Sequence, residues 1–374
     1  MLDDVMEKTK RILVLTHPEC DYGGAMLVQG LYQYLGSDAS RLVMYPLKFS
    51  YHDITHHYQL PGRDPGMTAP LPWFTPQPCW WANYTEQMPS GFHDADIEQE
   101  IVRMLREHEI EAVLLESGRP LAIDTFYRLR RAIREANVPI VMHDGEDFQE
   151  FRTNLPDSIA CDIYLKREVN VSTPVQFTIG RTLVQAFPFS TPYDCIAQAI
   201  SGAPDGLQHV DLAFCAGMTH PFRQQMANLL RDSAEQMGYT YALHLNNDER
   251  AQAEPLLGWA EYLQRMSHAS VAINIRGWGW DTVRHWEIPC ITAMASLRPN
   301  IQIPHPYQHG TSVLYGDTCE EVLSVANSAA KSRELRDLIF ENGVKHTLAW
   351  HTNMRRAEQM FEAIAEWKQQ RRRK

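Results

Sequence analysis

Short apolar segments alternate with amphipathic stretches along most of the chain, a pattern typical of strands that alternate with helices. The segments that we interpret as buried strands are Arg11–Thr16, Ala112–Leu115, Pro139–Met142, Cys161–Leu165, Val210–Cys215, Tyr239–Leu245, Val271–Ile275, Ile288–Met294 and Ser312–Tyr315. The stretches with helical spacing are Ala25–Leu35, Ile97–Leu105, Asp124–Ala136, a segment ending near Met237, Trp259–Met266, Cys319–Ala330, Ser332–Val344 and His351–Trp367. Since parallel strands are joined by helical crossovers, the sequence predicts an α/β protein with doubly wound sheets.

The chain has 374 residues, too many for one ordinary core, and fits two domains of about 150–200 residues each. Thr182–Pro192 carries two prolines between two strand–helix series, and we interpret it as the hinge. The predicted division is a first domain at 1–188, a second at 189–350 and a helical segment at 351–374.

Residues 46–95 interrupt the first domain, because they are rich in proline and aromatic residues and show no periodicity. Trp73, Trp80 and Trp81 need a partner for their apolar rings, so they either pack on the sheet or form a platform for a ligand. Two histidines four apart in this segment have metal-ligand spacing, but no further ligand motif accompanies them, and we predict no metal site.

Polar residues that suit a ligand are densest after the predicted strand Val271–Ile275. A glycine-rich loop follows, where the backbone turns and approaches a ligand closely, and Asp281 or Thr282 then caps a short helix. Helix-start amides attract phosphate, and a carboxylate on the helix accepts two sugar hydroxyls. The alternative is a salt bridge between Arg284 and Glu287 on a solvated face. The residues that we predict to bind a ligand here are Arg276, Gly277, Gly279, Asp281, Thr282, Arg284 and Glu287.

Two strand ends in the first domain also carry candidate residues. Asp21, Gly23 and Gly24 follow the first strand and form either a plain turn or a ligand loop. His143-Asp144-Gly145-Glu146-Asp147 follows the strand at Pro139–Met142. Its three acids repel one another, which raises the pKa of at least one, as general-base catalysis needs; the alternative is a solvated acidic turn that caps the next helix.

Two cations end the next strand, and another marks the start of the second domain. Lys166 and Arg167 are expected either to meet phosphate or to pair with the acids at 144–147. In the second domain, Gly217 lies in the loop after Val210–Cys215, and Arg223 lies in the first turn of the following helix. Arg223 is either an anion-binding residue or a surface arginine.

The composition is that of an ordinary globular protein, with a net charge of −11 that disfavours non-specific binding to nucleic acid. We expect a cytoplasmic protein, because no apolar run approaches the ~18 residues of a membrane span and the seven cysteines are scattered. The basic end at Arg371-Arg372-Arg373-Lys374 is either a solvated terminus or a contact for an anionic surface.

Three segments resemble one family. Asp281-Thr282-Val283-Arg284-His285-Trp286-Glu287 resembles the donor half of GT-B glycosyltransferases, closest to the "glycosyl transferases group 1" set that includes CgeB-like proteins. His143–Asp147 with Asp162–Glu168, and Gly343–His346 with the segment through Arg356, are similar to the middle and C-terminal patterns of that group.

The resemblance implies two Rossmann-like domains that face a cleft, with the C-terminal helix crossing back to the first domain. It implies transfer of a sugar from a nucleotide-diphosphate donor, UDP- or GDP-linked, without a metal or other cofactor. The first domain would take the acceptor through Trp73, Trp80, Trp81 and His143, and the second domain would hold the donor. Arg223 would neutralise the leaving diphosphate.

The loop with Gly23 and Gly24 would lie under the donor or acceptor, and an inverting enzyme would use Asp144, Glu146 or Asp21 as base. Three alternatives stay open: a transferase acting on a modified nucleic-acid base, a sugar-nucleotide epimerase of the same fold, and a non-catalytic nucleotide- or glycan-binding protein. The acceptor, the donor sugar, the stereochemistry and the oligomeric state are not readable from the sequence.

Overall fold

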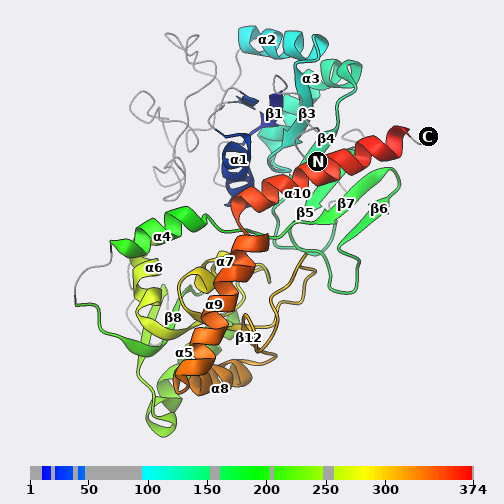
Figure 1. Ribbon diagram of the computed structural model, residues 1–374. Helices are drawn as coiled ribbons and strands as arrows, with labels where there is room; N and C mark the ends of the chain where they lie inside the picture. Colours follow the sequence, from blue (N-terminus) through cyan, green and yellow to red (C-terminus); the bar gives the residue numbers. More distant parts are fainter. Residues whose placement is uncertain are drawn as a thin grey trace.

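The chain forms two lobes, each built on one sheet with helices on its faces (Figure 1). The computed structural model describes residues 11–17, 22–36, 41–46, 95–151, 161–202, 206–246 and 257–372. Asp21, Trp73, Trp80 and Trp81 therefore lie outside the described residues.

The first lobe contains a seven-stranded sheet in the order β2-β1-β3-β4-β5-β7-β6, parallel except for the edge strand β6. Its strands are β1 (Arg11–Leu15), β2 (Leu42–Tyr45), β3 (Ile110–Leu115), β4 (Ile140–Asp144), β5 (Ile163–Lys166), β6 (Gln176–Ile179) and β7 (Thr182–Ala186). Its helices are α1 (Tyr22–Leu35), α2 (Ala95–Arg106) and α3 (Pro120–Ala136). The central strands are buried throughout, which explains their continuous apolar sequences.

The second lobe contains a five-stranded parallel sheet in the order β12-β11-β10-β8-β9. Its strands are β8 (Val210–Gly217), β9 (Tyr241–Asn246), β10 (Ala269–Asn274), β11 (Ala293–Leu297) and β12 (Leu314–Gly316). The helices from the hinge onward are α4 (Tyr193–Ser201), α5 (Pro221–Met237), α6 (Trp259–Ser267), α7 (Val283–Glu287), the 3-10 helix η6 (Ile288–Cys290), α8 (Cys319–Ala330), α9 (Arg333–Trp350) and α10 (Asn353–Arg372).

The predicted fold class is confirmed: the chain is α/β with two Rossmann-like sheets. In each sheet the chain first winds outward and then returns to the other side of its first strand, between β1 and β3 and between β8 and β10. Ligands of such sheets bind outside the carboxyl ends of the strands at these reversal points.

Two sequence-based boundaries were wrong. The predicted hinge at Thr182–Pro192 contains strand β7, which pairs with β5 and leaves only the following six residues as connection. The predicted strand at Ile288–Met294 begins instead as the 3-10 helix η6, and β11 starts at Ala293. Pro289 lies inside η6, where its fixed φ suits a helical turn and its missing N–H removes no ladder bond.

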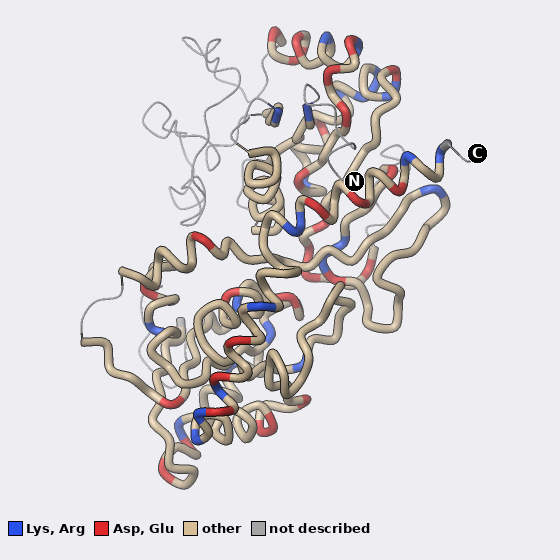
Figure 2. The backbone as a smooth tube through the Cα atoms, in the orientation of Figure 1, with Lys and Arg blue, Asp and Glu red and all other residues tan. Residues whose placement is uncertain are grey.

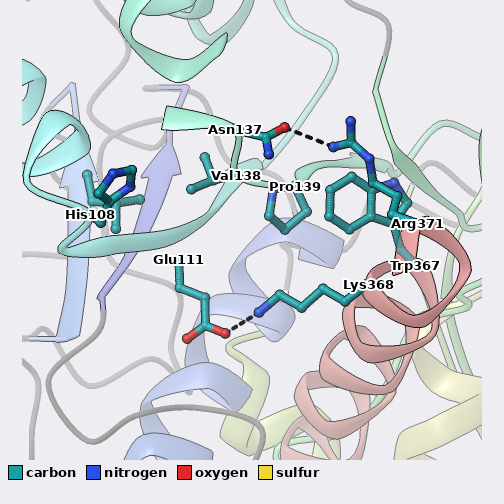
Figure 3. A pocket seen from close by; sticks show the side chains of 9 residues that line it. His108, Glu111, Asn137, Val138, Pro139, Trp367, Lys368 and Arg371 are labelled. Atoms are coloured by element: carbon teal, nitrogen blue, oxygen red, sulfur yellow. Dashed lines mark hydrogen bonds and ion pairs between the residues drawn. The ribbon is translucent and has the colours of Figure 1, made fainter. Parts of the chain in front are cut away.

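The C-terminal helix α10 leaves the second lobe and packs on the first, against α1, β5 and β7 (Figure 1). Its last turns reach the amino end of β3, where Lys368 forms an ion pair with buried Glu111 and Arg371 donates to Asn137 (Figure 3). Trp367 lies between them and donates its indole N–H to Asp162 over 3.1 Å. These contacts anchor the end of α10 at the edge of the sheet opposite to the carboxyl ends of the strands.

The chain crosses between the lobes twice, and the two crossings lie side by side. Thr191 on the first crossing pairs with Thr352 on the second in an isolated bridge. Thr191 donates its N–H to the His351 carbonyl over 2.9 Å, and Asn353 donates to the Thr191 carbonyl over 3.1 Å. Arg356 is buried and donates to the carbonyls of residues 188 and 189. The hinge is therefore a hydrogen-bonded pair of segments.

Acidic and basic residues are interspersed along both lobes, so neither lobe is a block of one charge (Figure 2). Within the described part of the chain, no helix is both long and apolar enough to cross a membrane.

Gly30 on α1 tests how closely α10 packs. A Cβ atom at Gly30 would lie 1.9 Å from the carbonyl oxygen of Asn353, which is backbone and cannot rotate away. We expect Gly30→Ala to destabilise the protein by about 1–3 kcal/mol through overpacking, measured by urea unfolding. Gly202→Ala is the matched control, because its nearest neighbours would be 3.8 Å away and its φ of −91° is open to alanine. Equal stability of the two variants would contradict the close packing.

Candidate active site

A cavity of about 560 Å³ lies between the lobes, and we call it the interlobe cavity. The first lobe and the hinge contribute Tyr22, Asp147, Arg167 and Phe189. The second lobe contributes Leu257, Trp259, Tyr262, Arg223 and residues of the segment 277–287. Arg223 follows β8 and the segment 277–287 follows β10, so the cavity lies at the reversal point of this sheet, and Leu257, Trp259 and Tyr262 reach it after β9.

Arg223 on the first turn of α5 joins the two loops of this reversal point. Its Nη1 atom donates to the Gly217 carbonyl over 2.5 Å and to the Thr219 hydroxyl over 2.9 Å. Its Nε atom donates to the Arg276 carbonyl over 2.9 Å. All these acceptors are uncharged, so the guanidinium keeps a full uncompensated charge at the cavity wall.

Arg284 on α7 is the second cation of this wall. Among the described residues its side chain forms no ion pair and no hydrogen bond, and its Nε atom is buried without a partner. Burial, followed by the charge of Arg284, lowers the pKa of Arg223 to about 9. Arg223 is buried and Arg284 is half-buried, and two guanidinium groups that repel one another at a cavity wall form a site for an anion.

Glu287 lies at the end of α7 with only 2% of its surface exposed. Its Oε1 atom accepts the indole N–H of Trp259 over 2.7 Å, which orients the carboxylate. Burial raises the pKa of Glu287, and the hydrogen bond from Trp259 and the charge of Arg284 oppose that rise. The predicted alternative, a solvated salt bridge between Arg284 and Glu287, is absent from the structure, since Glu287 is buried and the two residues form no ion pair.

Asp281 joins the second lobe to the hinge and to the first lobe. Its carboxylate accepts the Phe189 N–H over 2.6 Å and the Trp286 indole N–H over 2.7 Å. Its own N–H donates to Glu168 of the first lobe over 2.9 Å. Burial raises the pKa of Asp281 to about 7, against the lowering effect of nearby Arg167. Asp281 therefore lines the cavity with both oxygens already bonded.

Gly279 makes the approach of the two lobes possible. A Cβ atom there would lie 2.1 Å from Glu168 Oε1 and 2.5 Å from Asp147 Oδ1. Asp147 in turn pairs with Arg167, whose guanidinium lies over the Phe189 ring at 4.5 Å. A side chain at position 279 would push this group of charged residues apart.

Of the other predicted residues of the second lobe, Gly277 and Thr282 also line the cavity, whereas Arg276 and Gly217 do not. Thr282 precedes α7 but donates its hydroxyl to Asn274, over 2.8 Å. Arg276 donates to the Trp278 carbonyl over 2.6 Å and lies over the Trp280 ring. Gly217 lines a smaller adjoining cavity of about 120 Å³, together with Tyr262 and Arg284.

The predicted glycine loop of the first lobe has a packing role. Gly23 and Gly24 belong to the first turn of α1 and are buried, rather than forming a turn before the helix. A Cβ atom on Gly23 would lie 2.7 Å from His143, and one on Gly24 would lie 2.5 Å from Glu116. These glycines let α1 pack on the ends of β3 and β4. His143 is 1% exposed and bonds to the Glu116 carbonyl, and it does not line the interlobe cavity.

Of the predicted bases, Asp144 belongs to β4 and is fully buried in an ion pair with Lys166, at 3.1 Å. Glu146 is half-buried, donates its backbone N–H to Asp144, and does not line the interlobe cavity. The structure thus confirms the expectation that Lys166 and Arg167 pair with the acids at 144–147. The proximity of Asp144 and Lys166 disfavours Asp144 as a base, and Asp21 stays a prediction outside the described residues.

Sequence reasoning missed Trp259 and Tyr262, and it did not predict that Arg167 and Glu168 would meet the second lobe. Trp259 and Tyr262 lie three apart on α6 and so share the face that lines the cavity. That spacing was visible in the sequence, but it is also what a core-facing amphipathic helix shows. Arg167 and Glu168 follow β5, and only the packing of the lobes brings them to Asp281. Among the described residues, no group of three or more side chains suits a metal ion.

No family model matches the chain, and no curated protein matches it at a significant level. Among solved structures, the chain is similar to a Listeria monocytogenes protein assigned as a UDP-N-acetylglucosamine 2-epimerase, with a TM-score of 0.48, 12% identity and 96% of each chain covered. Anabaena HepE, solved with UDP and glucose, has a TM-score of 0.47 and 11% identity, with 96% of this chain and 100% of that chain covered.

The glycosyltransferase SnogD from Streptomyces nogalater has a TM-score of 0.41 and 12% identity, with 94% of this chain and 99% of that chain covered. At these TM-scores and identities the matches carry no argument about function.

His285, directly beneath the cavity on α7, makes stability depend on pH. Its complete burial lowers its pKa from 6.5 to about 3, so below pH 6.5 only the unfolded chain takes up this proton. Folding stability contributed by His285 is therefore present above pH 6.5 and lost as the pH falls, by about 1.4 kcal/mol per pH unit. Urea unfolding of wild type and His285→Gln between pH 7 and pH 5 measures this slope.

Below pH 6.5, we expect the free energy of unfolding of the wild type to fall by about 1.4 kcal/mol per pH unit more than that of His285→Gln, because the unfolded wild type takes up one more proton. Asp281, with a pKa of about 7, acts in the opposite direction, since it binds its proton in the folded state. That contribution is common to both proteins and cancels in the comparison. Parallel curves for the two proteins would show that His285 is not held neutral.

Proposed function

We propose that the chain is a GT-B type glycosyltransferase that binds a nucleotide-diphosphate sugar in the interlobe cavity and transfers the sugar to an acceptor. The observation that supports this most is the pair Arg223 and Arg284, which line the cavity and form no ion pair among the described residues. The resemblance of the segment 281–287 to the donor half of that family agrees with the same assignment.

The arginine pair suits a diphosphate for electrostatic reasons. A buried cation without a counter-ion is unfavourable, and two adjacent ones repel, as the lowered pKa of Arg223 reflects. A bound diphosphate would relieve both effects through charge-assisted hydrogen bonds. The same bonds would strengthen as the sugar departs and negative charge grows on the leaving oxygen, which lowers the barrier to transfer.

Glu287 would select a sugar-nucleotide over a simple phosphate. Trp259 holds one of its carboxylate oxygens, so the group is oriented before a ligand arrives. A carboxylate accepts two hydroxyl hydrogen bonds side by side, the arrangement of the 2- and 3-hydroxyls of ribose. The ionised form is the better acceptor, and Arg284 on the same helix favours it. We place no metal ion or other cofactor in this scheme.

The acceptor would enter from the first-lobe side, and closure of the lobes around it would exclude water. The proposed domain roles follow from that arrangement: 1–188 for the acceptor, 189–350 for the donor, and 351–374 as the brace on the first lobe. Asp21 and Glu146 remain the proposed bases of an inverting mechanism. Asp144 is less suitable, because its charge is already neutralised by Lys166.

An epimerase is the second candidate, favoured by one observation. His17, Glu116 and His143 lie together at the reversal point of the first sheet, where the backbone N–H of His17 donates to the Glu116 carboxylate and the His143 ring bonds to the backbone carbonyl of Glu116. Such a group of acid and histidines suits proton transfer on a sugar. All three are buried and none lines the interlobe cavity, so we rank this function second.

Nucleotide binding by defined variants tests the donor site. Wild type, Arg284→Gln, Glu287→Gln and the control Arg333→Gln would be titrated calorimetrically with UDP, GDP, ADP and CMP, since Arg333 is an exposed arginine far from the cavity. We expect one nucleoside diphosphate to bind and Arg284→Gln to weaken it about 10- to 100-fold, because a charge-assisted contact is lost. Glu287→Gln should weaken it about tenfold, and Arg333→Gln should bind as wild type does.

If none of the four nucleotides binds wild type, or if Arg284→Gln binds as tightly, the donor site is not there. Turnover then separates the two enzymes. Incubation of the matching sugar-nucleotide without an acceptor should leave the sugar configuration unchanged in a transferase. An epimerase would convert it to the epimer under the same conditions, which proton NMR detects.

A further inference from the structure

Trp278 exposes 72% of its surface while lining the interlobe cavity. It stands between Gly277 and Gly279 at the tip of the loop after β10. A tryptophan is the largest apolar side chain, and leaving it in water is unfavourable unless a partner covers it. Nothing in the donor assignment uses this side chain.

The loop that carries Trp278 is held in place, so the exposure is not a consequence of a loose backbone. Arg276 donates to the Trp278 carbonyl over 2.6 Å and stacks over Trp280 at 4.2 Å. On the other side, Gly279 fits against Glu168 and Asp147 with no room for a side chain. The backbone that carries the indole is therefore held in place, which lowers the entropy lost when a ligand packs on it.

The cavity has a buried end and an exposed end. At the buried end, Glu287 is 2% exposed and Arg223 is 4% exposed. At the exposed end, Trp278 faces outward together with Tyr22 of the first lobe, 49% exposed, and Asp147, whose side chain is 42% exposed. A nucleotide held by the buried groups leaves the exposed end for the second substrate.

We infer that Trp278, Tyr22 and Asp147 form the acceptor subsite, and that the acceptor is a pyranose ring of a glycan. This inference rests on the proposed function, since it assigns the second substrate of the same cavity. A pyranose presents a face of C–H groups, which packs on an aromatic ring, and a rim of hydroxyls, which bond to carboxylates. The exposed end of the cavity offers both chemistries side by side.

A planar aromatic acceptor fits this end less well. It would gain from Trp278 and Tyr22 but would bring apolar edges against the charged pair of Asp147 and Arg167. Desolvating those charges without new hydrogen bonds is unfavourable. A sugar replaces the displaced water with its own hydroxyls, so the polar groups stay satisfied.

The test uses the full chain and distinguishes the contribution of the aromatic face of Trp278 from that of its apolar bulk. Trp278→Phe keeps an aromatic face, Trp278→Leu keeps apolar bulk alone, and Trp350→Leu is the control, an exposed tryptophan on α9 that does not line the cavity. Each protein, with and without saturating UDP or GDP, is titrated with maltotriose, cellotriose, chitotriose and mannotriose by saturation-transfer NMR. Calorimetry gives the Kd of the nucleotide in parallel.

We expect at least one trisaccharide to bind the nucleotide complex of wild type, Trp278→Phe and Trp350→Leu with Kd values within about threefold. Trp278→Leu should weaken that binding at least about fivefold, because the stacking contribution is lost, while its nucleotide Kd stays within about twofold of wild type. Three results would overturn the inference. No trisaccharide binds the nucleotide complex of wild type, or Trp278→Leu binds the trisaccharide as tightly as wild type does, or Trp278→Leu loses affinity for the nucleotide and not for the sugar. If neither nucleotide binds wild type, the donor proposal fails, and that result is distinct from the other three.

Discussion

The carboxylate of Asp281 is the contact on which the candidate site depends. It is buried, and it accepts one hydrogen bond from the hinge at Phe189 and one from Trp286 on α7. Through its backbone N–H the same residue is bonded to Glu168 of the first lobe. One residue thus sets the position of the loop after β10, the direction of α7 and the approach of the lobes. Arg284 and Glu287 reach the cavity because α7 starts where Asp281 holds it.

A buried carboxylate in that position is unfavourable by itself, since burial raises its pKa to about 7. Its surroundings compensate through donors rather than through one strong ion pair, since the Nε atom of Arg167 is 3.9 Å away. Breaking any one donor would leave a buried acceptor unsatisfied, so the junction is sensitive to small shifts of the lobes. The hinge at Phe189, the loop after β10 and the segment just after β5 at Glu168 must therefore keep their relative positions for these hydrogen bonds to form.

Most of the fold could be predicted from the sequence, because its central strands are buried on both faces and therefore read as continuous apolar runs. Strands β2, β6 and β7 were not among the predicted strands. β6 is an exposed edge strand with little apolar signal, and β7 directly precedes two prolines that suggested a hinge. Ile288–Met294 was read as strand because a short apolar run does not distinguish a buried strand from a helical turn. The predicted domain limits remain predictions.

The residues of the site could be predicted only where their position after a strand end is itself enough to bring them to the cavity. Arg223, Arg284 and Glu287 follow strand ends within one segment each, so their common location follows from the topology of the sheet. Asp144 and the glycine pair at 23–24 have equally suggestive sequences, yet Lys166 neutralises the first and helix packing explains the second. Both outcomes depend on contacts with distant residues, which no local pattern contains.

The paired crossings at residues 191 and 352 constrain how the two lobes can move. The two crossing segments are joined by two backbone hydrogen bonds, and twisting one segment against the other would break both. Rotation about the line through the pair leaves those bonds intact, and Arg356 moves with them because its acceptors lie on the same segments. A swing of the lobes about this pair would break the bonds from Asp281 to Glu168 and from Gln302 to the Val169 carbonyl, so the two walls of the cavity are held in their present register. A substrate that enters the cavity therefore meets both walls in a single register.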